Sequence, residues 1–176
     1  MISQKIIRIT VEDDNPEGFK DITHSYTLFA STSKRNDPTK RGRFNLGEKQ
    51  VLSICNRGWV YTTKATVIFD EKGRVELPAE RNKGSKIVIE LNATEDDYNE
   101  LISHAKKLLV PNDIKFIVND VEMEQKRVSH TFETQLYTEI LKEDAMKLAF
   151  RKTTVQLIDT GDKKFIYEMG IPVTEP

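Results

Sequence analysis

Short, turn-forming connections between strand-like runs are the feature that most constrains the fold of this chain. Residues 65–69 and 74–77 have the composition of strands, and only Asp70-Glu71-Lys72-Gly73 separates them. Two further strand-like runs flank Asn119-Asp120, a strong signal for a tight hairpin. Connections this short join antiparallel strands, because parallel neighbours need a long crossover. The last third of the chain is therefore predicted to be mainly an antiparallel meander.

The remaining elements complete an α+β fold. Helical spacing of apolar residues predicts helices at 19–29 and 46–55. A third helix starts at Thr94, with Asp97 as its capping-box partner. Strands are expected at 2–11, 59–63, 65–69, 74–77, 87–91, 114–118, 121–123, 128–140, 155–158 and 165–167, with a turn at 160–162 between the last two.

These elements group into three regions. Residues 1–92 form the first region, residues 93–110 a helix, and residues 111–176 a β-rich extension that packs on the first region. The extension is expected to be a mainly antiparallel meander.

Composition limits the class of protein. The chain has 176 residues, of which 38% are hydrophobic and 31% charged, which fits a soluble globular protein. The net charge of −1 does not indicate nucleic-acid or anionic-membrane binding. A single cysteine, Cys55, rules out an internal disulfide. We find no membrane-spanning apolar run and no signal peptide, so we expect a cytoplasmic protein.

The first strand-like run begins almost at Met1, with Ile7, Ile9 and Val11 alternating with polar residues. A core strand so early leads us to expect a partial domain, or one that a partner chain completes. An open sheet edge would also favour a homodimer.

An acidic turn follows this strand, in the segment Val11–Phe19. The Asp13 carboxylate could accept a hydrogen bond from an exocyclic amine, with Gly18 allowing close backbone approach. An exposed acidic turn has the same composition. A calcium loop is excluded, because His24 falls where the bidentate acid would have to be.

A glycine turn, Gly42-x-x-Asn45-x-Gly47, precedes the second predicted helix. Such a turn exposes backbone N–H groups to an anion at the helix N-terminus. It lacks the Gly-Lys-Ser/Thr ending of a P-loop. The basic loop Lys34–Arg43 ahead of it either neutralises phosphates or is a solvated loop.

Further downstream, Gly84-Ser85 precedes a strand, where its hydroxyl could reach a ligand or complete a turn. The three histidines have no metal-ligand spacing. We expect Trp59 and Tyr61 to lie in the core rather than to form a stacking surface.

The order of these signatures is similar to that of the GHKL ATPase family, which includes gyrase, heat-shock chaperones, histidine kinases and mismatch-repair ATPases. Val11–Phe19 resembles the D-x-G-x-G box, with Asp13 as the adenine-binding acid, Asn15 where glycine is usual, and one extra residue, Glu17. Gly42–Gly47 resembles the G-x-x-G-x-G box, with Asn45 for the middle glycine. Asparagine tolerates positive φ better than other non-glycine residues, so both replacements are mild.

The resemblance covers residues 5–91 well and the remainder loosely. Gly84-Ser85 resembles the Gly-Thr pair near the adenine, and Ser31–Arg41 corresponds to the ATP lid. Tyr167–Val173 is similar to the end of topoisomerase-like members. The implied fold is a two-layer α/β sandwich with a mixed, mostly antiparallel sheet, here partial. The implied relatives are topoisomerase-like or phage and bacterial ATP-binding proteins.

The resemblance implies binding of ATP with magnesium. The nucleotide-binding residues would be Asp13, Asn15, Gly18, Lys34, Arg41, Gly42, Asn45, Gly47, Lys49 and Ser85. Family members also carry an upstream helix with a catalytic Glu and a magnesium-binding Asn, and the ten residues before the box contain neither. Glu95 and Asn99 have the spacing but follow the third motif, so we assign no catalytic residue and no metal ligand. We expect an ATP-binding domain with weak or no hydrolysis, or alternatively a non-catalytic interaction module that self-associates.

Overall fold

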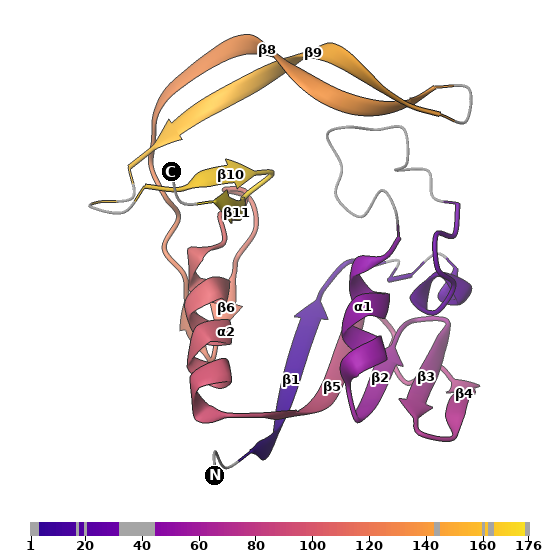
Figure 1. The fold of residues 1–176 in the computed structure, drawn as a ribbon. Helices are drawn as coiled ribbons and strands as arrows, with labels where there is room; N and C mark the ends of the chain where they lie inside the picture. Colours follow the sequence, from indigo (N-terminus) through magenta and orange to yellow (C-terminus); the bar gives the residue numbers. More distant parts are fainter. Residues whose placement is uncertain are drawn as a thin grey trace. The chain divides into compact units, whose positions relative to one another are not determined.

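The computed structural model describes residues 4–16, 18–19, 21–31, 45–142, 145–159, 161 and 164–174. The chain forms two compact units, residues 1–99 and 100–176. The boundary lies within helix α2, Glu95–Lys107 (Figure 1). Each unit is described by itself below.

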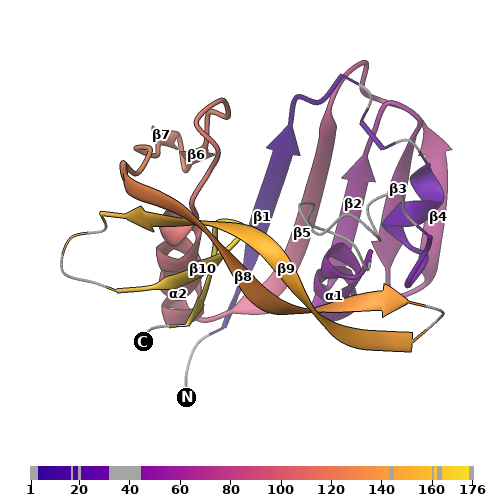
Figure 2. The ribbon, with the colours of Figure 1, turned by 90° about the horizontal axis from the view of Figure 1, so that it is seen from above.

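The first unit is built on a five-stranded sheet in which every pair of neighbouring strands is antiparallel. The strands are β1 (Lys5–Asp13), β2 (Arg57–Tyr61), β3 (Ala65–Asp70), β4 (Gly73–Pro78) and β5 (Ser85–Ala93). Their order in the sheet is β1-β5-β2-β3-β4, which can be followed across Figure 2. The expected antiparallel sheet is therefore confirmed.

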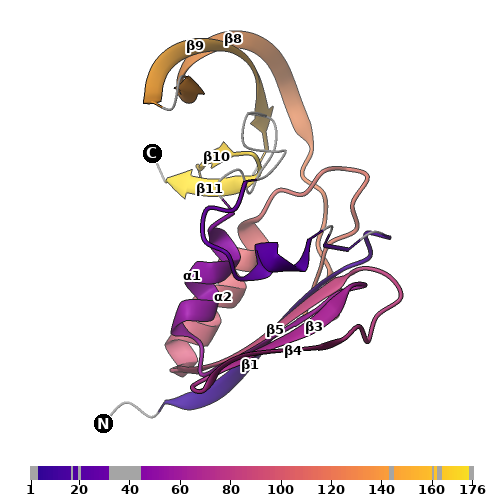
Figure 3. The same ribbon diagram turned by 90° about the vertical axis from the view of Figure 1, so that its right-hand side faces the viewer.

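Helix α1, Gly47–Ile54, packs on one face of this sheet. A Cβ added to Gly58 of β2 would lie 2.6 Å from Leu52 Cδ2, so the helix packs closely over this glycine. Val60 and Val67, which pair across β2 and β3 on the same face, are fully buried. The core of the first unit therefore lies between α1 and the middle strands (Figure 3).

The opposite face of the sheet carries the alternate residues. Trp59 pairs with Val88 on β5, which in turn pairs with Thr10 on β1. Trp59 and Tyr61 are half-buried there, not fully enclosed as core residues would be. The expectation that these two aromatic residues lie in the core is therefore wrong.

The predicted helix over 19–29 is not formed. Its described residues contain only the short 3-10 helix η1, Ile22–Ser25. Asp21 caps η1 by accepting hydrogen bonds from the Thr23 N–H and hydroxyl, and Phe29 has a left-handed φ of 55°. Hydroxyl and carboxylate side chains that bond to nearby backbone compete with a longer helix, which explains the difference.

The second unit consists of the end of α2 and three two-stranded hairpins. These are β6–β7 (Ile117–Val118 and Val121–Glu122), β8–β9 (Val128–Lys142 and Ala145–Ile158) and β10–β11 (Ile166–Glu168 and Ile171–Thr174). Asn119 and Asp120 both have positive φ, as the expected tight turn requires.

Two strand pairings in the second unit differ from the expectation. Residues 155–158 were expected to pair with 165–167 across a turn at 160–162. Instead they are the end of β9, which pairs along its whole length with β8. The run 165–167 contributes to β10, which turns back at Met169-Gly170 to pair with β11.

The fold is thus mixed α and β with mostly antiparallel sheets, as the sequence predicted at this coarse level. Among the described residues, no helix has the length and apolar character needed to cross a bilayer.

Candidate functional site

The acidic turn and the Gly84-Ser85 pair meet at one end of the sheet. Asp13, the last residue of β1, pairs with Ser85, the first residue of β5. The Asn15 carbonyl accepts hydrogen bonds from the Gly84 N–H at 2.9 Å and from the Gly18 N–H at 3.0 Å. Four of the residues predicted to bind a nucleotide therefore come together: Asp13, Asn15, Gly18 and Ser85.

Two glycines make this close approach possible. A Cβ on Gly84 would lie 2.1 Å from the Asp13 carbonyl oxygen, and Gly84 has a φ of +68°. Gly18 has a φ of +57°, and its Cβ would lie 3.2 Å from Thr63 Oγ1. Asn15 does not have a positive φ, so the left-handed residue of this turn is Gly18.

The polar side chains around the turn differ in how far they are exposed to solvent. Asp13 is exposed, and its Oδ1 accepts a hydrogen bond from the Asn15 N–H at 3.0 Å, which uses one of its two oxygens. Ser85 is only 5% exposed, and its Oγ would lie 3.5 Å from a Cβ at Gly18. The turn therefore places the Asp13 carboxylate, a hydrogen-bond acceptor, beside the buried Ser85.

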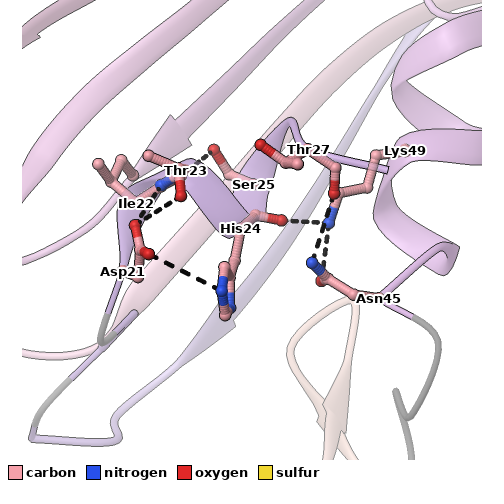
Figure 4. A network of polar contacts seen from close by, with 8 residues as sticks. All are labelled: Asp21, Ile22, Thr23, His24, Ser25, Thr27, Asn45 and Lys49. Atoms are coloured by element: carbon pink, nitrogen blue, oxygen red, sulfur yellow. Dashed lines mark hydrogen bonds and ion pairs between the residues drawn. The ribbon is translucent and has the colours of Figure 1, made fainter. Parts of the chain in front are cut away.

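A second polar group lies at the start of α1. Lys49 is 7% exposed, and its ammonium donates to Asn45 Oδ1 at 2.8 Å and to the His24 carbonyl (Figure 4). It also donates to Glu48 Oε1 at 2.6 Å. Asn45 also donates from Nδ2 to the Thr27 carbonyl at 3.5 Å. This network joins η1 and the residues after it to the first turn of α1.

Lys49 has no donor left for a ligand in this arrangement. An ammonium group has three N–H donors, and three protein oxygens accept from them. Lys49 was predicted to touch the nucleotide directly. The structure shows it instead holding the backbone and side chains at the start of α1.

Asn45 and Gly47 shape the entry to α1. Asn45 has a left-handed φ of 49°, which supports the prediction that it replaces a glycine in this turn. Leu46 is the N-cap and provides no side-chain cap, so the first N–H groups of the helix are not satisfied by a capping side chain. The N-terminus of α1 lies at the end of the sheet where β1 ends (Figure 1).

Three other residues that were predicted to bind a nucleotide lie outside the residues that the structure describes: Lys34, Arg41 and Gly42. Almost all of the predicted lid lies outside them as well. Sequence reasoning missed the contribution of Thr63 and of the His24 carbonyl. The Thr62 hydroxyl accepts hydrogen bonds from the Lys64 and Ala65 N–H groups, which stabilises a turn between β2 and β3. The Thr62-Thr63 pair between two predicted strands was therefore a sequence signal for Thr63.

Asp21, the N-cap of η1, has a perturbed pKa. Hydrogen bonds from the Thr23 hydroxyl and N–H lower the pKa of its carboxyl, with a smaller contribution from His24. In the described part of the chain, no three His, Cys, Asp or Glu side chains gather in a way that could hold a metal ion.

Comparison with protein-family models, with curated proteins and with solved structures found no match for this chain.

Proposed function

We propose that the first unit binds ATP in the manner of the GHKL family, at the turn formed by Asp13, Gly18 and Ser85. The observation that carries the proposal is the pairing of Asp13 with Ser85 beside the left-handed Gly18 and Gly84. Two motifs that are distant in the sequence supply a carboxylate, a hydroxyl and close backbone approach at one place.

Each residue has a distinct role in this proposal. The Asp13 carboxylate accepts a hydrogen bond from the exocyclic amine of adenine, while Ser85 faces the base edge. The N-terminus of α1, opened by Asn45 and Gly47, favours the phosphates through its N–H groups and its dipole. Lys49 acts indirectly, by fixing the start of α1.

The proposal concerns binding and assigns no hydrolytic step. Because the described residues provide neither a metal-ligand cluster nor an assigned general base, we expect ATP turnover by this chain to be weak or absent. A phosphate-release assay on the purified chain tests this expectation. Turnover at an ordinary rate of about 1 s⁻¹ or more would overturn it.

Thermal melting with and without ATP and magnesium tests the binding proposal. At about 100 times its Kd, ATP should stabilise the chain by about 2.7 kcal/mol, or roughly 5–10 °C in Tm. Asp13→Asn should abolish most of the rise. The matched control is Asp14→Asn, which removes the same charge from the neighbouring exposed residue and should leave the rise intact. Equal responses of the two variants, or no shift at millimolar ATP, would refute the site.

Self-association is a second candidate function, and the β8–β9 hairpin favours it. Tyr137 and Phe150 pair across this hairpin with ring centroids 3.8 Å apart, yet they are 66% and 58% exposed. Leu148 is also 68% exposed. An isolated two-stranded hairpin is marginally stable in water, so a second copy would benefit from covering this surface.

Sedimentation velocity over a range of concentrations tests self-association. The wild-type chain should dimerise, and Tyr137→Lys should shift it to the monomer. Gln156→Lys, an exposed polar position on the same face of the hairpin, is the control and should not. A monomeric wild type at high concentration excludes this function.

A further inference from the structure

A cavity of about 530 Å³ lies on the sheet face opposite α1. Its lining includes Arg8, Trp59, Tyr61, Arg81 and Lys86. The first two and Lys86 belong to β1, β2 and β5 and share the face of Trp59 in the strand register. The cavity is of a size that holds one nucleotide-sized ligand.

Trp59 is the aromatic centre of this cavity. It is half-buried, and two guanidinium groups lie over its ring in cation–π contacts: the Arg57 guanidinium carbon is 4.9 Å from the ring centroid and that of Arg8 is 5.9 Å away. Tyr61 lies two residues further along the same strand, on the same face. Neighbouring aromatic residues on an open sheet face, flanked by cations, are the arrangement on which nucleic-acid bases stack.

The connection between β4 and β5 encloses one side of the cavity. Arg81 donates to Glu12 Oε1 at 2.7 Å and to the Lys83 carbonyl at 3.1 Å, which holds this connection over the end of the sheet. Arg8 is similarly held by Glu90, with its Nε at 3.0 Å and its Nη2 at 2.5 Å from Oε1. These hydrogen bonds therefore hold the Arg8 and Arg81 side chains in place without a bound ligand.

Lys86 provides charge for an anion. It lines the cavity, and the structure shows no ion pair for it among the described residues. Glu90 and Glu12 offset the charges of Arg8 and Arg81, and Glu80 adds a carboxylate to the lining, so the cavity suits one or two phosphates rather than a long polyanion.

We propose that this cavity binds a nucleotide unit, with its base stacked on Trp59 and its phosphate near Lys86. The unit can come from single-stranded nucleic acid or from a free mononucleotide, because both present the same base and phosphate. The free mononucleotide is the favoured source, because the largely balanced charges of the lining suit one or two phosphates.

This site is separate from the proposed ATP site. Glu12 contacts Arg81 on the Trp59 face, and strand alternation places the neighbouring Asp13 on the other face. Asp13→Asn should therefore leave the cavity unchanged. A result that refutes one of the two proposals would not refute the other.

The chain contains one tryptophan, so its fluorescence reports directly on the cavity. Titration with thymidine octamer (dT8) and with thymidine 5′-monophosphate, each without ATP, should quench Trp59 emission. Tighter binding of dT8 identifies single-stranded nucleic acid as the source, and equal affinities identify the free nucleotide. Absence of quenching by both, at millimolar concentrations, overturns the proposal. Quenching by an acidic aromatic peptide alone would also overturn it.

Variants then test the named contacts by fluorescence anisotropy of labelled dT8, or of labelled mononucleotide if that is the source. Trp59→Ala should weaken binding at least fivefold, whereas Trp59→Phe should retain most of it. Lys86→Glu should also weaken binding, and added salt should weaken the wild type. Lys72→Glu, on the exposed β3–β4 turn, is the control for the charge change. Wild-type affinity in both Lys86→Glu and Trp59→Ala, with circular dichroism showing a folded chain, would refute the site.

Discussion

At the scale of residues, the candidate ATP site depends on positions where the backbone conformation favours few residue types. Gly84 has a positive φ and lies against the Asp13 carbonyl. Asn45 has a positive φ and also supplies the oxygen that Lys49 needs. Steric and hydrogen-bonding demands at these residues therefore place Asp13, Ser85 and the start of α1.

Gly84→Ala should destabilise the chain by at least about 2 kcal/mol, because its Cβ would lie 2.1 Å from the Asp13 carbonyl oxygen. Gly161→Ala is the matched control, since Gly161 has a similar φ of +73° but a Cβ there would meet nothing within 4 Å, and it should cost about 1 kcal/mol. Urea denaturation measures both. An equal loss in the two variants would mean that the contact with Asp13 has no energetic weight.

Lys49→Met should lower the free energy of unfolding by about 2–4 kcal/mol even without nucleotide. The change leaves the buried Asn45 amide oxygen, the His24 carbonyl and Glu48 without their donor. Lys72→Met, at an exposed turn, should change stability by less than about 0.5 kcal/mol. If Lys49→Met were as stable as the wild type but lost ATP binding, Lys49 would be a direct ligand.

At the scale of elements, local signals determine where α1, α2 and the tight hairpins begin and end. Thr94 and Asp97 form the reciprocal capping box that their spacing predicts: the Asp97 N–H donates to Thr94 Oγ1 at 3.1 Å, and the Thr94 N–H donates to Asp97 Oδ2 at 2.8 Å. These interactions are contained within four residues, so they need no distant partner.

The capping box lowers the pKa of Asp97, first through the Thr94 N–H and then through its hydroxyl. Because the folded pKa lies below the unfolded one, the carboxylate stabilises α2 above the unfolded pKa, and this contribution is lost as pH falls through the folded value. Thr94→Ala should move the pKa part of the way back toward 3.8, while Thr94→Ser should keep it low. Carbon-13 NMR titration of the Asp97 carboxyl measures its pKa in both variants. Identical pKa values in the two variants would exclude a contribution from the Thr94 hydroxyl.

Cys55 at the end of α1 offers a second test at this scale. Burial raises the pKa of its thiol above 9.0, and the thiol donates to the Leu52 carbonyl at 3.3 Å. Thiol alkylation should therefore be slower in the folded chain than in denaturant at the same pH. Since Cys55 is the single cysteine, alkylation adds one label to the chain, and mass spectrometry measures the rate of this addition. Equal rates would show that α1 does not shield it.

At the scale of the whole molecule, the two units differ in how much they bury. Val60, Val67 and Ile89 are at most 5% exposed in the first unit. In the second unit the hairpins are each only two strands wide, and most of their large apolar side chains are exposed. Stability should therefore be unevenly distributed along the chain.

Native-state hydrogen exchange should show this difference. The slowest amides should lie in β2, β3 and β5, because each of these strands has hydrogen-bonded neighbours on both sides. Amides of β6–β7 and β10–β11 should exchange fastest, since each hairpin has only one partner per strand. Protection of β8–β9 equal to that of β5 in a dilute sample would contradict this order. Protection that appears only at high concentration would instead indicate self-association through this hairpin.

The amino-acid sequence by itself determined the features that depend on neighbouring residues. The turns at Asp70–Gly73 and Asn119-Asp120, the capping box of α2 and the left-handed Asn45 all follow from local steric and hydrogen-bonding preferences. The tertiary structure alone decided the rest. It paired β1 with β5, so that Asp13 meets Ser85, it enclosed the Lys49 ammonium, and it placed Trp59 on the sheet face opposite α1. These outcomes depend on which strands pair and which face a helix covers, and both are set by contacts between residues far apart in the chain.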